Sequence, residues 1–266
     1  MKTSSLVGYI VRLHCSDRRL RQTLCGIVVF CVGLCTLVSW AVVSGYEGED
    51  IEPISYSYLY SFSGRVGYIV PLLIAGFIVV SEWKSGQLLR TQILTRNRTK
   101  TFTSVALAAQ TIAGVASIIV LFICFTATGC LITLGGHDPL FFTPTQLLIV
   151  LRIALLHVLW ASVGIGLGFM FRSQSLLVGV VLSFAIFIEP TISAISNRSQ
   201  VIMDVTKWLP GPLNWSISWN ADVGNVGVQT AIGLRWYYAI VVMGVYTLAL
   251  NLIAYMIVTK RDIERR

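Results

Sequence analysis

Charged residues are scarce in this chain of 266 residues. Asp, Glu, Lys and Arg together make up 12 % of it, whereas hydrophobic residues make up 55 %. Soluble globular proteins carry roughly 25 % charged residues, which they need to cover their surface. The composition therefore excludes a soluble globular protein, and the mean hydropathy of +0.77 indicates an integral membrane protein.

Motifs for metal, disulfide or nucleotide chemistry are also missing from the sequence. No C-x-x-C pair occurs, the three histidines are widely spaced, and no G-x-x-x-x-G-K-[ST] phosphate loop is present. The six cysteines sit mostly in apolar runs, where a small packing side chain is the expected role. We expect no metal and no cofactor in this chain, and no enzyme activity of its own.

Acidic residues are the rarer of the two charged classes, with 12 against 20 basic residues and a net charge of +8. In a soluble protein such a balance would suggest nucleic acid as a partner. In a membrane protein the excess has another cause, because Lys and Arg collect in cytoplasmic loops. We therefore expect contacts with membrane lipids and none with nucleic acid.

Long apolar runs are what the sequence has in abundance. A bilayer core of ~30 Å requires about 20 mostly apolar helical residues, and the runs show no strand-like alternation. We predict an all-α membrane protein in which residues 23–258 form six transmembrane helices. Their predicted ranges are 23–44, 64–82, 104–134, 146–171, 176–195 and 236–258.

The basic residues predict the orientation of these helices. Counted over alternate connections, 15 Lys and Arg residues fall on the side of the two termini and 4 on the other. The positive-inside rule then places both termini in the cytoplasm. The protein is thus expected to be a multi-pass protein of the cytoplasmic membrane, with a basic cytoplasmic tail at 259–266.

The segment before the first span, residues 1–22, is too polar to cross a membrane. Leu6, Ile10 and Leu13 recur near one helical face, and Arg12 and Arg18 lie elsewhere. This pattern predicts an amphipathic helix in the inner membrane interface. A basic tail without fixed structure is the alternative.

The connection between the second and third spans, residues 81–100, is the most informative stretch of the sequence. It contains a basic cluster and an apolar set that includes Leu89 and Ile93. Apolar side chains exposed on a cytoplasmic loop favour a protein partner. The alternative is that these residues dip into the lipid head groups.

This connection resembles the corresponding region of the permease subunits of ABC-2 type transporters. The resemblance is carried by Glu82, Lys84, Gly86, Leu89 and Arg96, and by the layout of six spans after an interfacial helix. The chain departs from the family pattern at two points. Gln87 replaces a threonine, and no proline flanks the basic residue, which lies between Thr95 and Asn97.

The resemblance implies that residues 82–100 contain a coupling helix that docks on a separate ABC ATPase subunit. ATP and Mg²⁺ would bind to that partner, which is present in two copies per complex. It also implies that the six-span chain pairs with a second copy or with a related permease.

Two predicted spans contain a charged residue. Arg152 and Glu189 lie at similar depth, ~10 Å from the outer ends of consecutive helices, and each is costly alone in lipid. We predict that they form a polar pair near the pathway. Pro190 follows directly and removes a helical hydrogen bond, so the fifth span should kink or end there.

The function that these observations favour is that of an ABC-2 type exporter permease for a hydrophobic or amphipathic substrate, such as a drug, lipid or antimicrobial peptide. One alternative is a membrane sensor or immunity protein that binds an extracellular compound without moving it. Another is an intramembrane enzyme, although no nucleophile–base or metal-ligand set is evident in the spans.

Overall fold

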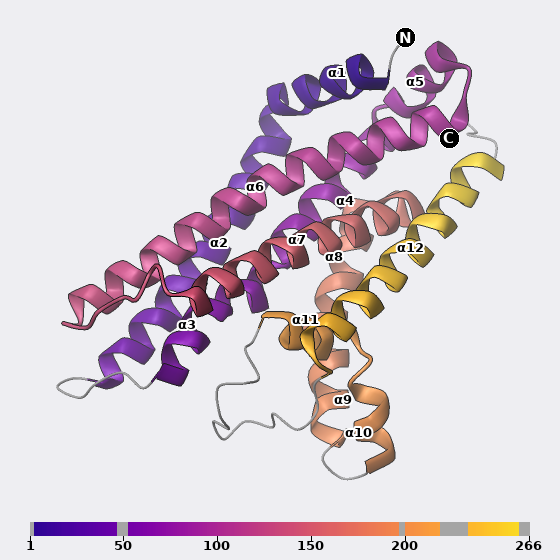
Figure 1. The fold of residues 1–266 in the computed structure, drawn as a ribbon. Coiled ribbons are helices and arrows are strands. Elements are labelled where there is room, and N and C mark those ends of the chain that lie inside the picture. The colour runs from indigo at the N-terminus through magenta and orange to yellow at the C-terminus, as the bar shows by residue number, and fades with distance from the viewer. Residues whose placement is uncertain (1–2, 47–52, 197–199, 219–233, 261–266) are drawn as a thin grey trace.

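The computed structural model describes residues 3–46, 53–196, 200–218 and 234–260, and its regular elements there are all helical (Figure 1). Most of the predicted basic tail, from residue 261 on, lies outside the described residues. The helices are α1 (Thr3–Ser16), α2 (Arg18–Val43), α3 (Pro53–Gly67), α4 (Ile69–Lys84), α5 (Gln87–Thr95), α6 (Arg98–Leu134), α7 (Pro144–Phe171), α8 (Gln174–Ser183), α9 (Glu189–Ser196), α10 (Gln200–Thr206), α11 (Pro210–Ser218) and α12 (Trp236–Lys260).

Six stretches in these parts are long and apolar enough to span a membrane, which confirms the predicted fold class. They are Arg21–Val43, Tyr58–Lys84, Arg98–Leu134, Pro144–Phe171, Gln174–Ile192 and Trp236–Lys260. The second and third spans each begin six residues earlier than predicted, the second at Tyr58 and the third at Arg98. Polar and aromatic residues before Gly64 hid the beginning of the second span, because they lower the local hydropathy.

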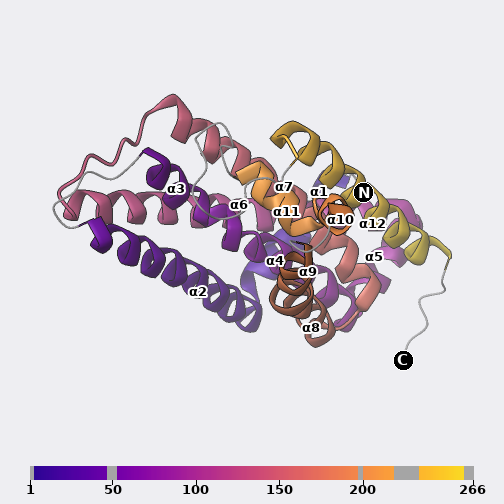
Figure 2. The same ribbon diagram turned by 90° about the horizontal axis from the view of Figure 1, so that it is seen from below.

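The centre of the bundle is the pair α4 and α7, whose backbones approach closely through glycines. A Cβ atom at Gly164 would collide with the carbonyl of Leu72, and one at Gly168 would lie 2.8 Å from the carbonyl oxygen of Gly76. The G-x-x-x-G pattern of the fourth span therefore serves packing within the chain. Helix α2 packs on α6 and α12 packs on α7, on opposite sides of this pair (Figure 2).

Two prolines interrupt regular α-helix inside spans. Pro71 has no N–H to bond the carbonyl of Gly67, and the second span divides there into α3 and α4 at Tyr68. In the fifth span a π-helical turn, Phe184–Ile188, precedes Glu189 and Pro190. The predicted end at Pro190 does not occur, because the helix continues through the proline as α9 to Ser196.

Helices α1 and α5 lie at one end of the bundle, together with the end of α12 and close to the N-terminus (Figure 1). Helix α1 ends at Ser16, and α2 already begins at Arg18, four residues before the predicted boundary at 22. Leu6 and Ile10 are buried in the main core, and α1 packs chiefly on α6. Protein therefore covers the apolar face that the sequence assigned to lipid, because α6 extends far enough to meet it.

Candidate functional site

A polar site forms where the last turn of α1 meets the last turn of α4. Leu6, Ile10 and His14 recur every four residues on α1, so they share the face that turns inward. All three are buried. The first two meet apolar side chains of the core, whereas His14 arrives beside Ser81 and Glu82 at the end of α4.

The hydrogen bonds of His14 define its tautomer when the ring is neutral. Nδ1 lies 2.9 Å from the carbonyl oxygen of Ile10, and since a carbonyl only accepts, Nδ1 must carry a hydrogen. Nε2 then holds a lone pair and lies 2.8 Å from the Ser81 oxygen, and the one hydrogen of that hydroxyl also lies within reach of the Ile78 carbonyl oxygen, at 2.8 Å. In this state Nε2 has no hydrogen to donate to Glu82 Oε1, which lies 3.4 Å away.

Burial favours that neutral ring. It lowers the pKa of His14 from its ordinary value, and this effect outweighs the Ile10 carbonyl and the charge of Asp17, which both act to raise the pKa. Glu82 is only 1 % exposed. Neither of its carboxylate oxygens has a hydrogen-bond partner among the described residues.

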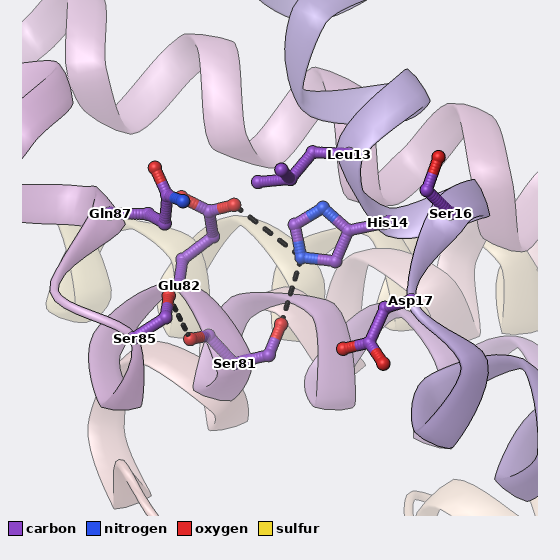
Figure 3. A pocket seen from close by; sticks show the side chains of 8 residues that line it. All are labelled: Leu13, His14, Ser16, Asp17, Ser81, Glu82, Ser85 and Gln87. Atoms are coloured by element: carbon purple, nitrogen blue, oxygen red, sulfur yellow. Dashed lines mark hydrogen bonds and ion pairs between the residues drawn. The ribbon is translucent and has the colours of Figure 1, made fainter.

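A cavity of about 330 Å³ adjoins this pair (Figure 3). It is lined by Leu13, His14, Ser16, Asp17, Ser81, Glu82, Ser85 and Gln87. Its rim includes the exposed residues Ser16, Asp17 and Ser85, so the cavity opens to the outside of the bundle. Apart from Leu13, the lining residues have polar side chains, and the two carboxylates among them are Asp17 and Glu82.

Helix α5 begins directly beyond this cavity. Gly86 has a left-handed backbone with φ 68°, which lets the chain reverse between α4 and α5 without steric cost. Leu88 and Thr91 are buried and face α4 and α6. On the other face Ile93 and Leu94 are 67 % and 72 % exposed. One face of α5 is thus anchored, and the other presents two adjacent apolar side chains.

The six residues of the 82–100 segment that were predicted to couple to the ATPase differ in their exposure and surroundings. Glu82 is buried and faces α1, while Lys84 lies exposed at the end of α4 and Gly86 forms the turn. Leu89 is half-buried on α5, and Ile93 is exposed on its free face. Arg96 ends α5 with a left-handed backbone, φ 49°.

The predicted pathway residues have different surroundings. The guanidinium carbon of Arg152 lies 4.4 Å from the ring centroid of Trp236, in a cation–π contact. The Glu189 carboxylate lies against Gly211 of α11, where a Cβ atom would have no room. The ion pairs that join described residues do not include Arg152 with Glu189. The contacts given for the described residues thus place the two side chains beside different neighbours, Trp236 and Gly211.

Sequence reasoning missed His14, Ser81 and Leu94 as members of this end of the bundle. A signal for His14 was present, because it continues the Leu6–Ile10 spacing and places a polar ring on an otherwise apolar face. The sequence contains no such signal for Leu94, since the exposure of its side chain depends on how α5 is rotated against α6. Over the described residues no three His, Cys, Asp or Glu side chains are grouped closely enough to hold a metal ion.

Comparison with known proteins adds no assignment. No protein-family model matches the chain, and no curated protein sequence matches it significantly. What can be said of the molecule is that it is a helical protein with six candidate membrane spans.

Proposed function

We propose that the chain is the permease subunit of an ABC-2 type exporter and that α5 is its docking helix for a separate ATPase. The observation that supports this most directly is the exposed pair Ile93 and Leu94 on a short helix between two spans. Exposed adjacent apolar side chains on a polar connection favour a protein partner.

The setting of α5 suits a mechanical role. Its buried face packs on both α4 and α6, so a displacement of α5 acts on two spans at once. Arg90 and Arg96 are exposed on the same short helix, and they would contact an acidic rim around an apolar groove on the ATPase. The partner would bind ATP and Mg²⁺, for which this sequence has no phosphate loop.

A second six-span chain would complete the pathway, either another copy or a related permease. The surface available for it is large, because only 11 % of the apolar window of Gln174–Ile192 and 17 % of that of Trp236–Lys260 are buried inside the chain. Both termini and α5 would be cytoplasmic, as the excess of Lys and Arg at that side favours. The cargo would be hydrophobic or amphipathic.

The test is capture of the ATPase on the purified full chain. Ile93→Asp combined with Leu94→Asp should abolish recovery of a stoichiometric ATPase while leaving the chain folded, because both side chains are exposed. The matched control is Arg12→Asp, an exposed change on α1 that lies outside the residues predicted for coupling. If no ATPase accompanies even the wild-type chain, the permease assignment is wrong and a sensor or immunity protein becomes the better hypothesis.

A further inference from the structure

We propose that the cavity between α1 and α4 binds a primary ammonium group, R–NH₃⁺, through the carboxylate of Glu82. The proposal does not depend on an ATPase or on the exposed face of α5, although Gln87 at the start of α5 contributes to the lining. It concerns a small ligand, and its evidence is the hydrogen-bond inventory of the cavity.

With His14 neutral, Glu82 has no cation among the described residues. It is 1 % exposed, and its single ion-pair contact there is with His14. The neutral tautomer of His14 directs a lone pair, not a hydrogen, toward that contact, as the Ile10 bond requires. A buried carboxylate without a donor is costly, and a cation that enters the cavity would remove this cost.

Gln87 is the lining side chain with amide N–H donors, whereas the serine side chains at the rim accept hydrogen bonds. The Ser85 hydroxyl already donates to the carbonyl of Ser81 at 2.8 Å, and the Ser16 hydroxyl donates to that of Arg12 at 3.0 Å. Their oxygens therefore retain only acceptor capacity. Asp17 adds a second carboxylate at the rim. A ligand with several N–H donors and a positive charge fits this lining best.

An ammonium group fits better than a divalent metal ion. Metal sites require several ligands that converge on one point, and the described part of the chain has no such group. An ammonium group donates three hydrogen bonds and tolerates acceptors at varied angles. The cavity of about 330 Å³ also has room for a short organic chain beyond the nitrogen.

This chemistry has two sources, a free amine or the head group of phosphatidylethanolamine. Ethanolamine serves as the probe because it carries the group that both share. The full-length protein is placed in nanodiscs of phosphatidylcholine alone, and binding is measured by titration calorimetry. Ethanolamine should bind the wild type at least about tenfold more tightly than Glu82→Gln, as expected for losing a charge-assisted hydrogen bond. Asp204→Asn, an exposed change on α10, is the control and should bind like the wild type.

Two other probes test the chemistry without any substitution. Choline keeps the positive charge but has no N–H, and ethylene glycol replaces the ammonium by a hydroxyl, so both should bind at least about tenfold more weakly than ethanolamine. These comparisons on the wild type decide the matter even if Glu82→Gln does not fold.

The source of the amine is distinguished by lipid composition. In nanodiscs with equal parts of phosphatidylcholine and phosphatidylethanolamine, a lipid that occupies the site should weaken ethanolamine binding about tenfold, whereas a site for free amines should be unaffected. Either result supports the ammonium site. Undetectable ethanolamine binding in phosphatidylcholine, equal binding of choline or ethylene glycol, or unchanged affinity in a folded Glu82→Gln would overturn it.

Discussion

Arg65 and Glu82 lie on the same span near its two ends, and both are buried, with 8 % and 1 % of their surface exposed. Their surroundings differ. The guanidinium carbon of Arg65 lies 3.7 Å from the ring centroid of Trp215 and 4.7 Å from that of Tyr58. Glu82 has a buried imidazole, serine hydroxyls and a cavity instead.

This difference indicates that Arg65 is a structural charge and that Glu82 is a candidate for binding a ligand. Around Arg65 the structure is closed: the Asn214 amide donates to the carbonyl of Gly64 at 3.3 Å, and the indole N–H of Trp160 donates to Asn214 at 2.9 Å. Rings and hydrogen bonds from three helices thus enclose this end. Around Glu82 the acceptors exceed the donors, so the end near α1 is the one prepared for a ligand.

The strongest way to disturb this comparison is to break the rigid contact of α4 and α7 that lies between the two ends. Gly164→Ala would place a methyl group in the Leu72 carbonyl, and overpacking of this kind costs about 1–3 kcal/mol or more. We expect a clear loss in thermal stability of the purified chain. Gly114→Ala on α6, where a Cβ meets nothing within 4 Å, should change the stability little or raise it.

The closed end is tested by Arg65→Leu, which keeps apolar volume but removes the contacts with Trp215 and Tyr58. Cation–π contacts are worth about 0.5–2 kcal/mol each, so we expect a destabilisation of about 1–3 kcal/mol in thermal unfolding. Arg90→Leu, which alters an exposed arginine of α5, is the control. Equal melting temperatures for the two variants would contradict a structural role of Arg65.

The open end should respond in the opposite direction. Glu82→Gln removes a buried carboxylate that lacks donors and keeps its size, so without amine the variant should be as stable as the wild type or up to about 1 kcal/mol more stable. Unfolding in amine-free detergent measures this. A loss comparable to that of Arg65→Leu would show that Glu82 is already compensated.

The smallest effect concerns pH. Because burial lowers the pKa of His14 in the folded state, the unfolded chain binds the proton first as pH falls below about 6.5. The free energy of unfolding of the wild type should therefore fall by less than about 1.5 kcal/mol from pH 7 to pH 5.5. Well above pH 6.5 the ring is neutral in both states and no stability is lost. His14→Gln should show a smaller loss. Asp17 and Glu82, which face the ring, remain in both proteins, so the difference between the two curves reports the imidazole.

The sequence predicted the six spans well because each is long and continuously apolar, and hydropathy reads that directly. It also drew attention to the region of Pro190, since a missing N–H is a local property, although the structure has a π-helical turn just before the proline and no helix end there. The surroundings of Arg152 and Glu189 could not be read in the same way. Equal depth on consecutive helices says nothing about rotation about the helix axes, and rotation decides that Arg152 meets Trp236 and Glu189 meets Gly211.

The polar site also contains a contact that the sequence did not predict. Glu82 was singled out from its place in a motif, yet its buried partner His14 lies 68 residues earlier in the chain. Their meeting depends on the chain turning between Ser16 and Arg18, which carries α1 back across α6 and α4. Such a tertiary contact leaves only a weak trace in the sequence, here the continued spacing of Leu6, Ile10 and His14.

The length of α6 determines how far one of its ends moves when the helix tilts. Its 37 residues form a rod of about 55 Å at 1.5 Å per residue, almost twice the ~30 Å of a bilayer's hydrocarbon core. No proline interrupts it, and α5 rests against its beginning while the connection to α7 starts at its other end. Tilting such a rod by about 5° about one end displaces the other by about 5 Å, given that rise per residue. On the proposed function, a displacement of α5 that tilts α6 would therefore also move the far end of α6.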